Sequence, residues 1–419
     1  MRKAKNIFEN IDGVSIILYI ILVFFGWINI YASQYNDDNI IILDLASRHG
    51  KQLIFIGVAF LIAFLILIID WKFFDVFSYF FYGLIILLLI GVLLIGEATN
   101  DSVSWFEIGR FKIQPSEFAK FITALALAKY FNLQEKSTRL RKKLTAYLII
   151  FVPFLLIVLQ NDTGTALVFL AFSLVLYREG MSGNILILGV ILFTLLILTF
   201  LMNKVILSSI FSVLAIIILF FSRKRKKEIQ FIIICWGIII GSIFSISYIS
   251  EDVLLPHHTQ RIKILLGQEI DPQGAGYNLI QSKIAIGAGG LFGKGFLNGT
   301  QTRFDFVPEQ STDFIFCTIG EEWGFVGSLV FIACFISLIL RTFFIAERQR
   351  SNFSRIYAYS VGCILFIHFV INIGMTIGLF PVIGIPLPFI SYGGSSLIGF
   401  TILLFILLNL DSYRLQILR

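Results

Sequence analysis

The chain has 419 residues, of which 58% are hydrophobic and only 14% are charged. Water-soluble domains are far more polar, so the composition excludes a soluble fold and predicts one integral membrane domain over 1–419, in contact with membrane lipid. The formal net charge of +7 does not indicate a nucleic-acid partner, because basic residues lie in short runs between apolar segments.

Twelve apolar segments are long enough, or nearly so, to cross a bilayer as helices, which takes ~20 residues. We expect spans at 13–32, 52–69, 74–96, 115–131, 144–160, 163–178, 182–203, 205–221, 230–249, 312–340, 356–378 and 392–410. If Arg2, Lys3 and Lys5 are cytoplasmic, alternation also places the basic runs RLRKK and RKRKK inside. The prediction is an all-α polytopic protein with both termini in the cytoplasm.

One long segment, residues 250–312, lies outside these spans, and the same topology places it on the outer face beside a smaller loop at 97–114. Its mixture of glycine, proline, aromatic and apolar residues differs from that of disordered tracts. We therefore expect a large extracytoplasmic loop that forms an ordered cap over the helix bundle.

Asp313, in the run PEQSTDFIF, is the outer-edge carboxylate placed closest to the membrane. An ionisable group at that depth costs about 3 kcal/mol or more unless it is paired or solvated, so it points to a partner, an ion or a reaction. The alternative is structural, because STD before an apolar run also fits a helix N-cap. One carboxylate can serve both purposes, and the motif alone leaves both open.

Other polar residues lie at the outer ends of predicted spans. Asp162 occupies a tight connection in LQNDTGTALVF, and Glu117 and Lys120 fall in the first turns of a helix that proline 115 starts. A spacing of three places Glu117 and Lys120 on one helical face, where they form either a local ion pair that supports packing or part of a functional site.

Two pairs of polar residues lie inside predicted spans, Glu321 with Glu322 and His368 with Asn372. Buried polar groups in membrane helices usually find hydrogen-bond partners within the bundle. We therefore expect the members of each pair to satisfy each other.

The glycine-rich stretch DPQGAGYNLIQSKIAIGAGGLFGKGFLNGTQ lacks the nucleotide-binding patterns GxGxxG and GxxxxGK[ST]. Its glycines permit tight folding, and cations able to donate to a diphosphate lie in or near it: Arg261, Lys263, Lys283 and Lys294. The alternative is an irregular loop with solvated lysines. The later stretch FPVIGIPLPFISYGGSS breaks membrane-level sequence with proline and glycine, which predicts a groove lined by irregular backbone.

Four stretches carry a family resemblance: SWFEIGRFKIQPSEFAK, QNDTGTA, the segment from QRIKILLG to TDFIF, and NIGMTIGLFPVIGIPLPFISYGGSS. Together they resemble the SEDS proteins (shape, elongation, division and sporulation), and within them the RodA branch. The resemblance implies a bundle of ten core transmembrane helices. Residues 204–249 are then expected to form an added transmembrane hairpin, which makes about twelve helices in total.

The resemblance implies a peptidoglycan glycosyltransferase that joins lipid II units during cell elongation and so supports rod shape. It implies a location in the bacterial cytoplasmic membrane, with the active site on the outer face. The implied partners are a class B penicillin-binding transpeptidase and the rest of the elongation machinery.

The resemblance also implies roles for single residues. Asp313 matches the family's essential aspartate and is the expected catalytic residue. The residues expected to bind substrate are Trp105, Glu117, Lys120, Asp162, Arg261, Gln281, Ser282 and Lys283. Around Asp162 the family motif QPDLGT reads QNDTGT in this chain, a departure of two residues at that turn.

The implied reaction transfers a glycan from a polyprenyl diphosphate with inversion, so one displacement needs one base, which we assign to Asp313. The departing diphosphate needs a cation, and the candidates are Arg261, Lys283, Lys120 or a divalent ion such as Mg²⁺ or Mn²⁺. A lipid-precursor flippase is an alternative, because it also needs a polar groove among spans, and a noncatalytic scaffold for the transpeptidase is another.

Overall fold

A computed structural model divides the chain into two compact units. The first comprises Met1–Met181, Asn278–Ile377 and Ile383–Arg419, and the second Ser182–Tyr277 and Gly378–Val382. The residues that the structure describes are 10–35, 44–45, 47–99, 102–108, 111–133, 139–222, 226–248, 256–266, 275–304 and 306–415. The amino-terminal basic residues, the first three residues of RKRKK and the DPQ part of the glycine-rich stretch lie outside these ranges.

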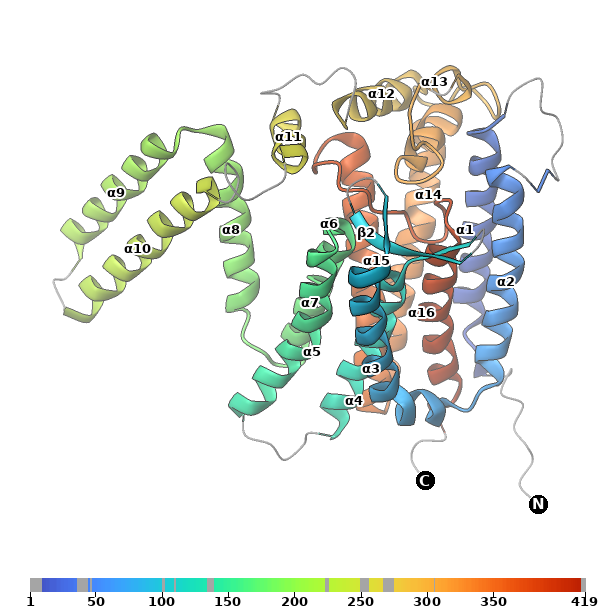
Figure 1. Ribbon diagram of the computed structural model, residues 1–419, viewed down its shortest axis with the longest axis horizontal. Coiled ribbons are helices and arrows are strands. Elements are labelled where there is room, and N and C mark those ends of the chain that lie inside the picture. The colour runs from blue at the N-terminus through green and yellow to red at the C-terminus, as the bar shows by residue number, and fades with distance from the viewer. Residues whose placement is uncertain are drawn as a thin grey trace. The chain divides into compact units, whose positions relative to one another are not determined.

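The first unit is a bundle of helices (Figure 1). It contains α1 (Gly13–Ala32), α2 (Arg48–Ile68), α3 (Trp71–Ile95), α4 (Pro115–Leu133), α5 (Arg139–Leu159), α6 (Thr163–Val168), α7 (Ala171–Arg178), most of α12 (Ala275–Ala288), α13 (Thr300–Arg303), α14 (Ile315–Arg348), α15 (Asn352–Ile377) and α16 (Gly394–Ser412). Side-chain caps start several of these helices, since Asp12 accepts from Ser15 N at 3.1 Å and Asp70 from Lys72 N at 2.9 Å.

The second unit contains α8 (Asn184–Leu201), α9 (Lys204–Phe221), α10 (Lys226–Tyr248) and α11 (Pro256–Leu265). Leu195, Leu207 and Ile243 form a small core between α8, α9 and α10. The indole N–H of Trp236 donates to Ser212 Oγ at 3.1 Å, which joins α10 to α9. These two helices fall within the predicted hairpin, and its status as an addition to a ten-helix fold stays a prediction.

Eight of the described helices are long and apolar enough to span a membrane: α1, α2, α3, α9, α10, α14, α15 and α16. Shorter apolar helical stretches at Lys143–Leu159, Thr163–Arg178 and Leu186–Leu201 accompany them. The prediction of a predominantly α-helical, multi-pass membrane protein is confirmed. α4 adds a helix that carries three charged residues, Glu117, Lys120 and Lys129.

Two segments differ from the predicted elements. The span expected at 163–178 is split into α6 and α7, because Phe169 N and Leu170 N donate to oxygens three residues back, at 3.0 and 3.1 Å, and so interrupt the α-helical pattern. The loop expected at 97–114 contains the short antiparallel strands β1 (Glu97–Thr99), β2 (Ser102–Ile108) and β3 (Phe111–Ile113), paired in the order β1-β2-β3. An all-helical description is therefore incomplete at this connection.

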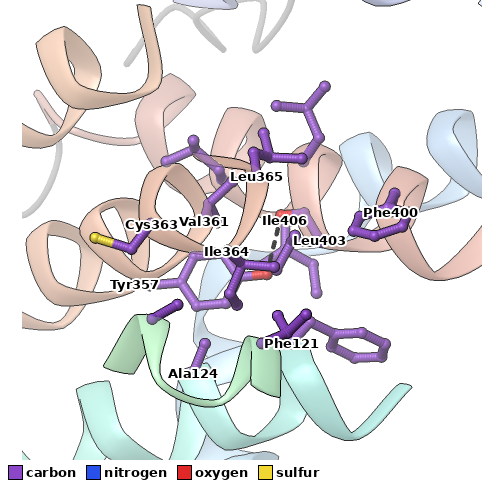
Figure 2. Close-up of a cluster of buried hydrophobic side chains, with 14 of the residues drawn as sticks. Phe121, Ala124, Tyr357, Val361, Cys363, Ile364, Leu365, Phe400, Leu403 and Ile406 are labelled. Carbon is purple, nitrogen blue, oxygen red and sulfur yellow. Dashed lines mark hydrogen bonds between the residues drawn. The ribbon is translucent and has the colours of Figure 1, made fainter. Parts of the chain in front are cut away.

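The interior of the first unit is built mainly by α4, α15 and α16. Figure 2 shows Phe121 and Ala124 of α4 packed with Tyr357 and Ile364 of α15. The Tyr357 hydroxyl donates to the main-chain oxygen of Leu403 on α16 at 3.0 Å, which satisfies its polar group inside an apolar cluster. These three helices form the framework on which the candidate site rests.

The two ends of the first unit meet at one end of this bundle. Arg414 Nη1 donates to the main-chain oxygen of Asn10 at 3.2 Å. Arg348 forms ion pairs with both Asp12, before α1, and Asp411, in the last turn of α16. Helices α1 and α16 are thereby tied together through α14.

Candidate active site

Lys120 lies in a buried ion pair on α4. Its Nζ atom is 2.8 Å from Oε2 of Glu117, and the two side chains are only 3% and 2% exposed. Nζ also lies 3.1 Å from Nε2 of His368 on α15 and 4.3 Å from the ring centroid of Phe400 on α16. The ion pair predicted from the spacing is confirmed. Because it is enclosed by three helices, the Lys120 charge depends on these partners for its stability.

Asp313 is half-buried and lies two residues before α14. The Asn372 side-chain amide on α15 donates to the Asp313 main-chain oxygen at 2.8 Å. A side chain at Gly384 would bring its Cβ within 3.3 Å of Asp313 Oδ2, so the carboxylate lies directly against this glycine. The N-cap residue of α14 is Phe314, whose side chain makes no cap bond, so Asp313 lies one residue before the N-cap position.

One face of α15 holds both the ion pair and the aspartate against the same stretch of chain, residues 383–393. His368 Nδ1 lies 3.2 Å from the main-chain oxygen of Pro386, and Asn372 Nδ2 donates to that of Ile385 at 2.7 Å. The prediction that His368 and Asn372 satisfy each other is wrong. No residue of 383–393 is helical, so their carbonyl groups are available as partners for α15.

Asp162 begins α6 and accepts three hydrogen bonds. Oδ1 accepts from Thr165 N at 3.0 Å, and Oδ2 accepts from Gln114 Nε2 at 2.8 Å and from Ser116 Oγ at 2.9 Å. The carboxylate therefore caps α6 and also ties it to the start of α4. These contacts position the helix that carries the ion pair, whereas contact between Asp162 and substrate stays a prediction.

The glycine-rich segment packs into a kink of α14. Gly324 interrupts the helix with φ +65° and ψ −163°. The N–H groups of the next two residues, Phe325 and Val326, donate to the oxygens of Gly290 and Leu291 at 2.9 and 3.0 Å. The kink thus leaves two main-chain N–H groups of α14 without helical partners, and carbonyl oxygens of the glycine-rich segment accept from them.

Glu321, beside this kink, is fully buried and accepts from Lys294 Nζ at 2.7 Å. It also accepts from the main-chain N–H groups of Thr300, Gln301 and Thr302 at 2.8 to 2.9 Å. The prediction that Glu321 and Glu322 satisfy each other is wrong. Lys294 already serves a carboxylate of the fold, so it is a poor candidate for a diphosphate ligand.

The remaining predicted site residues occupy different environments. Trp105 lies on β2 and is half-buried. On α12, Ser282 is buried and donates to a main-chain oxygen of α15 at 3.0 Å, Gln281 is half-buried and Lys283 is exposed. Arg261 lies on α11, in the second unit. Their roles toward substrate stay predictions.

Arg48, at the start of α2, is a cation that the motifs did not mark. Its Nη1 atom donates to Ser311 Oγ at 2.8 Å, two residues before Asp313. The main-chain oxygen of Ser311 accepts from Tyr392 N at 2.8 Å. Burial raises the pKa of Tyr392, and the Arg48 charge offsets part of that rise. An arginine on the outer side of the predicted topology runs against the positive-inside rule, and that is the signal that could have identified it.

These contacts gather a half-buried carboxylate, a buried ion pair and an exposed arginine around residues 383–393. A carboxylate in poorly solvated surroundings can take a proton from a hydroxyl group, and fixed cations stabilise a departing diphosphate. Across the described residues, no group of three or more His, Cys, Asp or Glu side chains is placed to hold a metal ion.

Known proteins resemble the chain over most of its length. Peptidoglycan glycosyltransferase MrdB of Escherichia coli (strain K12) is 37% identical over 318 residues, which are 76% of this chain and 73% of that protein. Peptidoglycan glycosyltransferase RodA of Treponema pallidum (strain Nichols) is 33% identical over 414 residues, 93% of this chain and 94% of that protein. A structure described as "Structural coordination of polymerization and crosslinking by a peptidoglycan synthase complex" contains a chain with a TM-score of 0.71 and 26% identity, covering 97% of this chain and 99% of that one.

The family model for cell cycle proteins of the FtsW, RodA and SpoVE type matches residues 13–209 and 197–416. The two matches together cover almost all of the chain, and the relatives agree with them. The resemblance inferred from the motifs is confirmed, and the chain belongs to the FtsW, RodA and SpoVE family of cell cycle proteins.

Proposed function

We propose that this chain is a peptidoglycan glycosyltransferase that polymerises lipid II into glycan strands for cell elongation. The names of its MrdB and RodA relatives support this activity. Within the molecule, the observation that carries the proposal is the face of α15, which holds the Asp313 backbone and the Lys120 charge against residues 383–393.

Asp313 acts as the general base of an inverting displacement. The hydroxyl oxygen of one lipid II attacks the anomeric carbon of another while Asp313 takes the hydroxyl proton. The bond from that carbon to the polyprenyl diphosphate breaks, and its electron pair leaves with the diphosphate. A positioned base of this kind contributes ~10²- to 10⁴-fold to the rate.

The cations divide into two groups. Lys120 is neutralised by Glu117, so it serves mainly to organise the interior of the site. The exposed Arg48 and Lys283 suit the departing diphosphate better, because their charges are accessible to a substrate. Arg261 is the further candidate that the family motif indicates.

The proposed orientation places both termini in the bacterial cytoplasm and the active site on the outer face. The arginine-rich end of α14, which contacts Asp12 and Asp411, then lies on the inner side, in agreement with the positive-inside rule. The proposed partner is a class B penicillin-binding transpeptidase. The similarity to a chain from a peptidoglycan synthase complex supports such a pairing.

The test is polymerisation of purified lipid II by the reconstituted protein with its transpeptidase partner. Wild type should form glycan, and Asp313→Asn, which keeps the shape but loses the base, should be slower by about 10²-fold or more. Asp75→Asn is the matched control, because it alters a carboxylate of the same unit that pairs with Lys129 at 2.8 Å instead of with the site. This control should polymerise at the wild-type rate.

Two outcomes would overturn parts of the proposal. Equal polymerisation by wild type and Asp313→Asn would remove the base assignment. A folded, partnered wild type that makes no polymer would remove the enzyme assignment, and movement of labelled lipid II across vesicles would then separate a flippase from a scaffold.

A further inference from the structure

His368 stands between the Lys120 ion pair and the chain that follows α15. Its side chain is 1% exposed. One ring nitrogen, Nε2, lies 3.1 Å from Lys120 Nζ, and the other, Nδ1, lies 3.2 Å from the main-chain oxygen of Pro386. The ring of Phe400 meets the imidazole edge to face at 4.8 Å and also underlies Lys120 at 4.3 Å. Both ring nitrogens therefore have defined partners.

The chemistry of these partners fixes the tautomer. A carbonyl oxygen only accepts hydrogen bonds, so the hydrogen must lie on Nδ1. Lys120 pairs with the Glu117 carboxylate and is therefore an ammonium group, which only donates. Nε2 must then present its lone pair to Lys120, and the imidazole is neutral. A protonated ring would set two cations 3.1 Å apart in a buried site.

We propose that His368 is a positioning residue of the glycosyl transfer, acting through Lys120. As a neutral imidazole it accepts from the ammonium and donates to Pro386, so it fixes the cation relative to residues 383–393, the stretch against which Asp313 lies. This inference rests on the proposed glycosyltransferase function. It assigns to His368 no contact with the reacting atoms.

Two substitutions separate positioning from packing. His368→Phe keeps an aromatic ring of similar size and removes both nitrogens, whereas His368→Gln keeps one donor and one acceptor. At saturating lipid II we expect His368→Phe to lower the polymerisation rate about tenfold or more, and His368→Gln to restore most of that loss. Ser360→Ala is the matched control, since Ser360 is buried on the same helix and donates only to its own helix, at 2.8 Å. It should keep the wild-type rate.

A second measurement does not depend on activity. The chain has four histidines, so ¹⁵N-histidine labelling gives a simple solid-state NMR spectrum, in which the signals lost in His368→Phe identify residue 368. We expect a neutral ring with hydrogen on Nδ1 and an Nε2 signal that moves in Lys120→Met.

The possible results are distinguishable. A ring with hydrogen on Nε2, or an Nε2 signal unchanged in Lys120→Met, would overturn the proposed pairing even if the wild type makes polymer. Wild-type rates in folded His368→Phe would overturn the positioning role. An inactive wild type with the expected NMR signature would instead contradict the proposed function and leave the pairing intact.

Discussion

Asp162 shows how a single side chain positions the site through several hydrogen bonds at once. A helix cap alone needs one acceptor, but this carboxylate accepts from α6, from Gln114 and from Ser116. Its loss would therefore free the N-terminus of α6 and leave two polar side chains at the start of α4 without this acceptor. The effect should exceed that of removing a cap with one bond.

We predict that Asp162→Ala destabilises the protein by about 2–4 kcal/mol, combining a cap of about 1 kcal/mol with buried polar groups left unsatisfied. Asn203→Ala is the comparison, because Asn203 caps α9 through one bond to Val205 N at 2.9 Å. It should cost about 1 kcal/mol. Thermal unfolding in detergent measures both, and equal shifts would show that the bonds to α4 contribute nothing.

Single residues were predictable where the chemistry is local. Glu117 and Lys120 are three residues apart on a helix, so their spacing alone indicated the ion pair. His368 lies 248 residues from Lys120, and Arg48 lies 263 from Ser311, so only the packing of α15 and α2 in the folded bundle brings them together. The spacing of residues along one helix carries no information about partners so far away in the sequence.

At the scale of elements, the kink of α14 is the feature with the strictest steric requirement. Gly324 has φ +65°, and a Cβ there would lie 2.2 Å from the main-chain nitrogen of Gly293. Both the backbone angle and the contact exclude a side chain, because main-chain atoms of the loop cannot move aside cheaply.

We predict that Gly324→Ala lowers stability by about 2 kcal/mol or more, because it combines backbone strain with a steric clash. Gly287→Ala is the control, since Gly287 lies within α12 and has nothing within 4 Å of its Cβ position. Alanine there should be neutral or stabilising by up to about 1 kcal/mol. Similar unfolding midpoints for both variants would mean that the loop does not constrain the kink.

The long helices could be predicted because crossing a bilayer requires apolar runs of a set length, and such runs can be read directly from the sequence. The strands β1, β2 and β3 were missed because they are short and lie in a connection without alternating polarity over enough residues. The break between α6 and α7 was missed because its residues, Phe169 and Leu170, are as apolar as a continuous span would be. Hydropathy reports an apolar environment, either lipid or protein interior, and it does not report where hydrogen bonding changes.

At the scale of the whole first unit, charged residues form two separate groups, one at each end of the helix bundle. Asp313 and Arg48 lie at the end where α2 and α14 begin, whereas Asp12, Arg348 and Asp411 lie where α1 begins and α16 ends. The proposed chemistry needs a site that faces substrate at the first end. The ion pairs among Asp12, Arg348 and Asp411 hold the helices together at the other end. We therefore expect the residues of these ion pairs to affect the stability of the protein more than its activity.

Among the residues of these ion pairs, Asp12 has a shifted pKa, so its contribution to stability should change with pH. Burial raises its pKa, but hydrogen bonds from Arg341 and Ser15 outweigh burial and hold the pKa below its ordinary value. A carboxyl group whose pKa is lowered on folding stabilises the folded state at pH values above its ordinary pKa of about 4, and this contribution is lost as pH falls further.

We predict that Asp12→Asn lowers the free energy of unfolding by about 1.5–3 kcal/mol at pH 7, because it removes the charge from bonds made by an arginine. The difference in unfolding midpoint between wild type and variant should shrink as pH falls from 5 to 3, while lipid II polymerisation at neutral pH stays near the wild-type rate. A difference that is constant with pH would show that the Asp12 charge does not stabilise the fold.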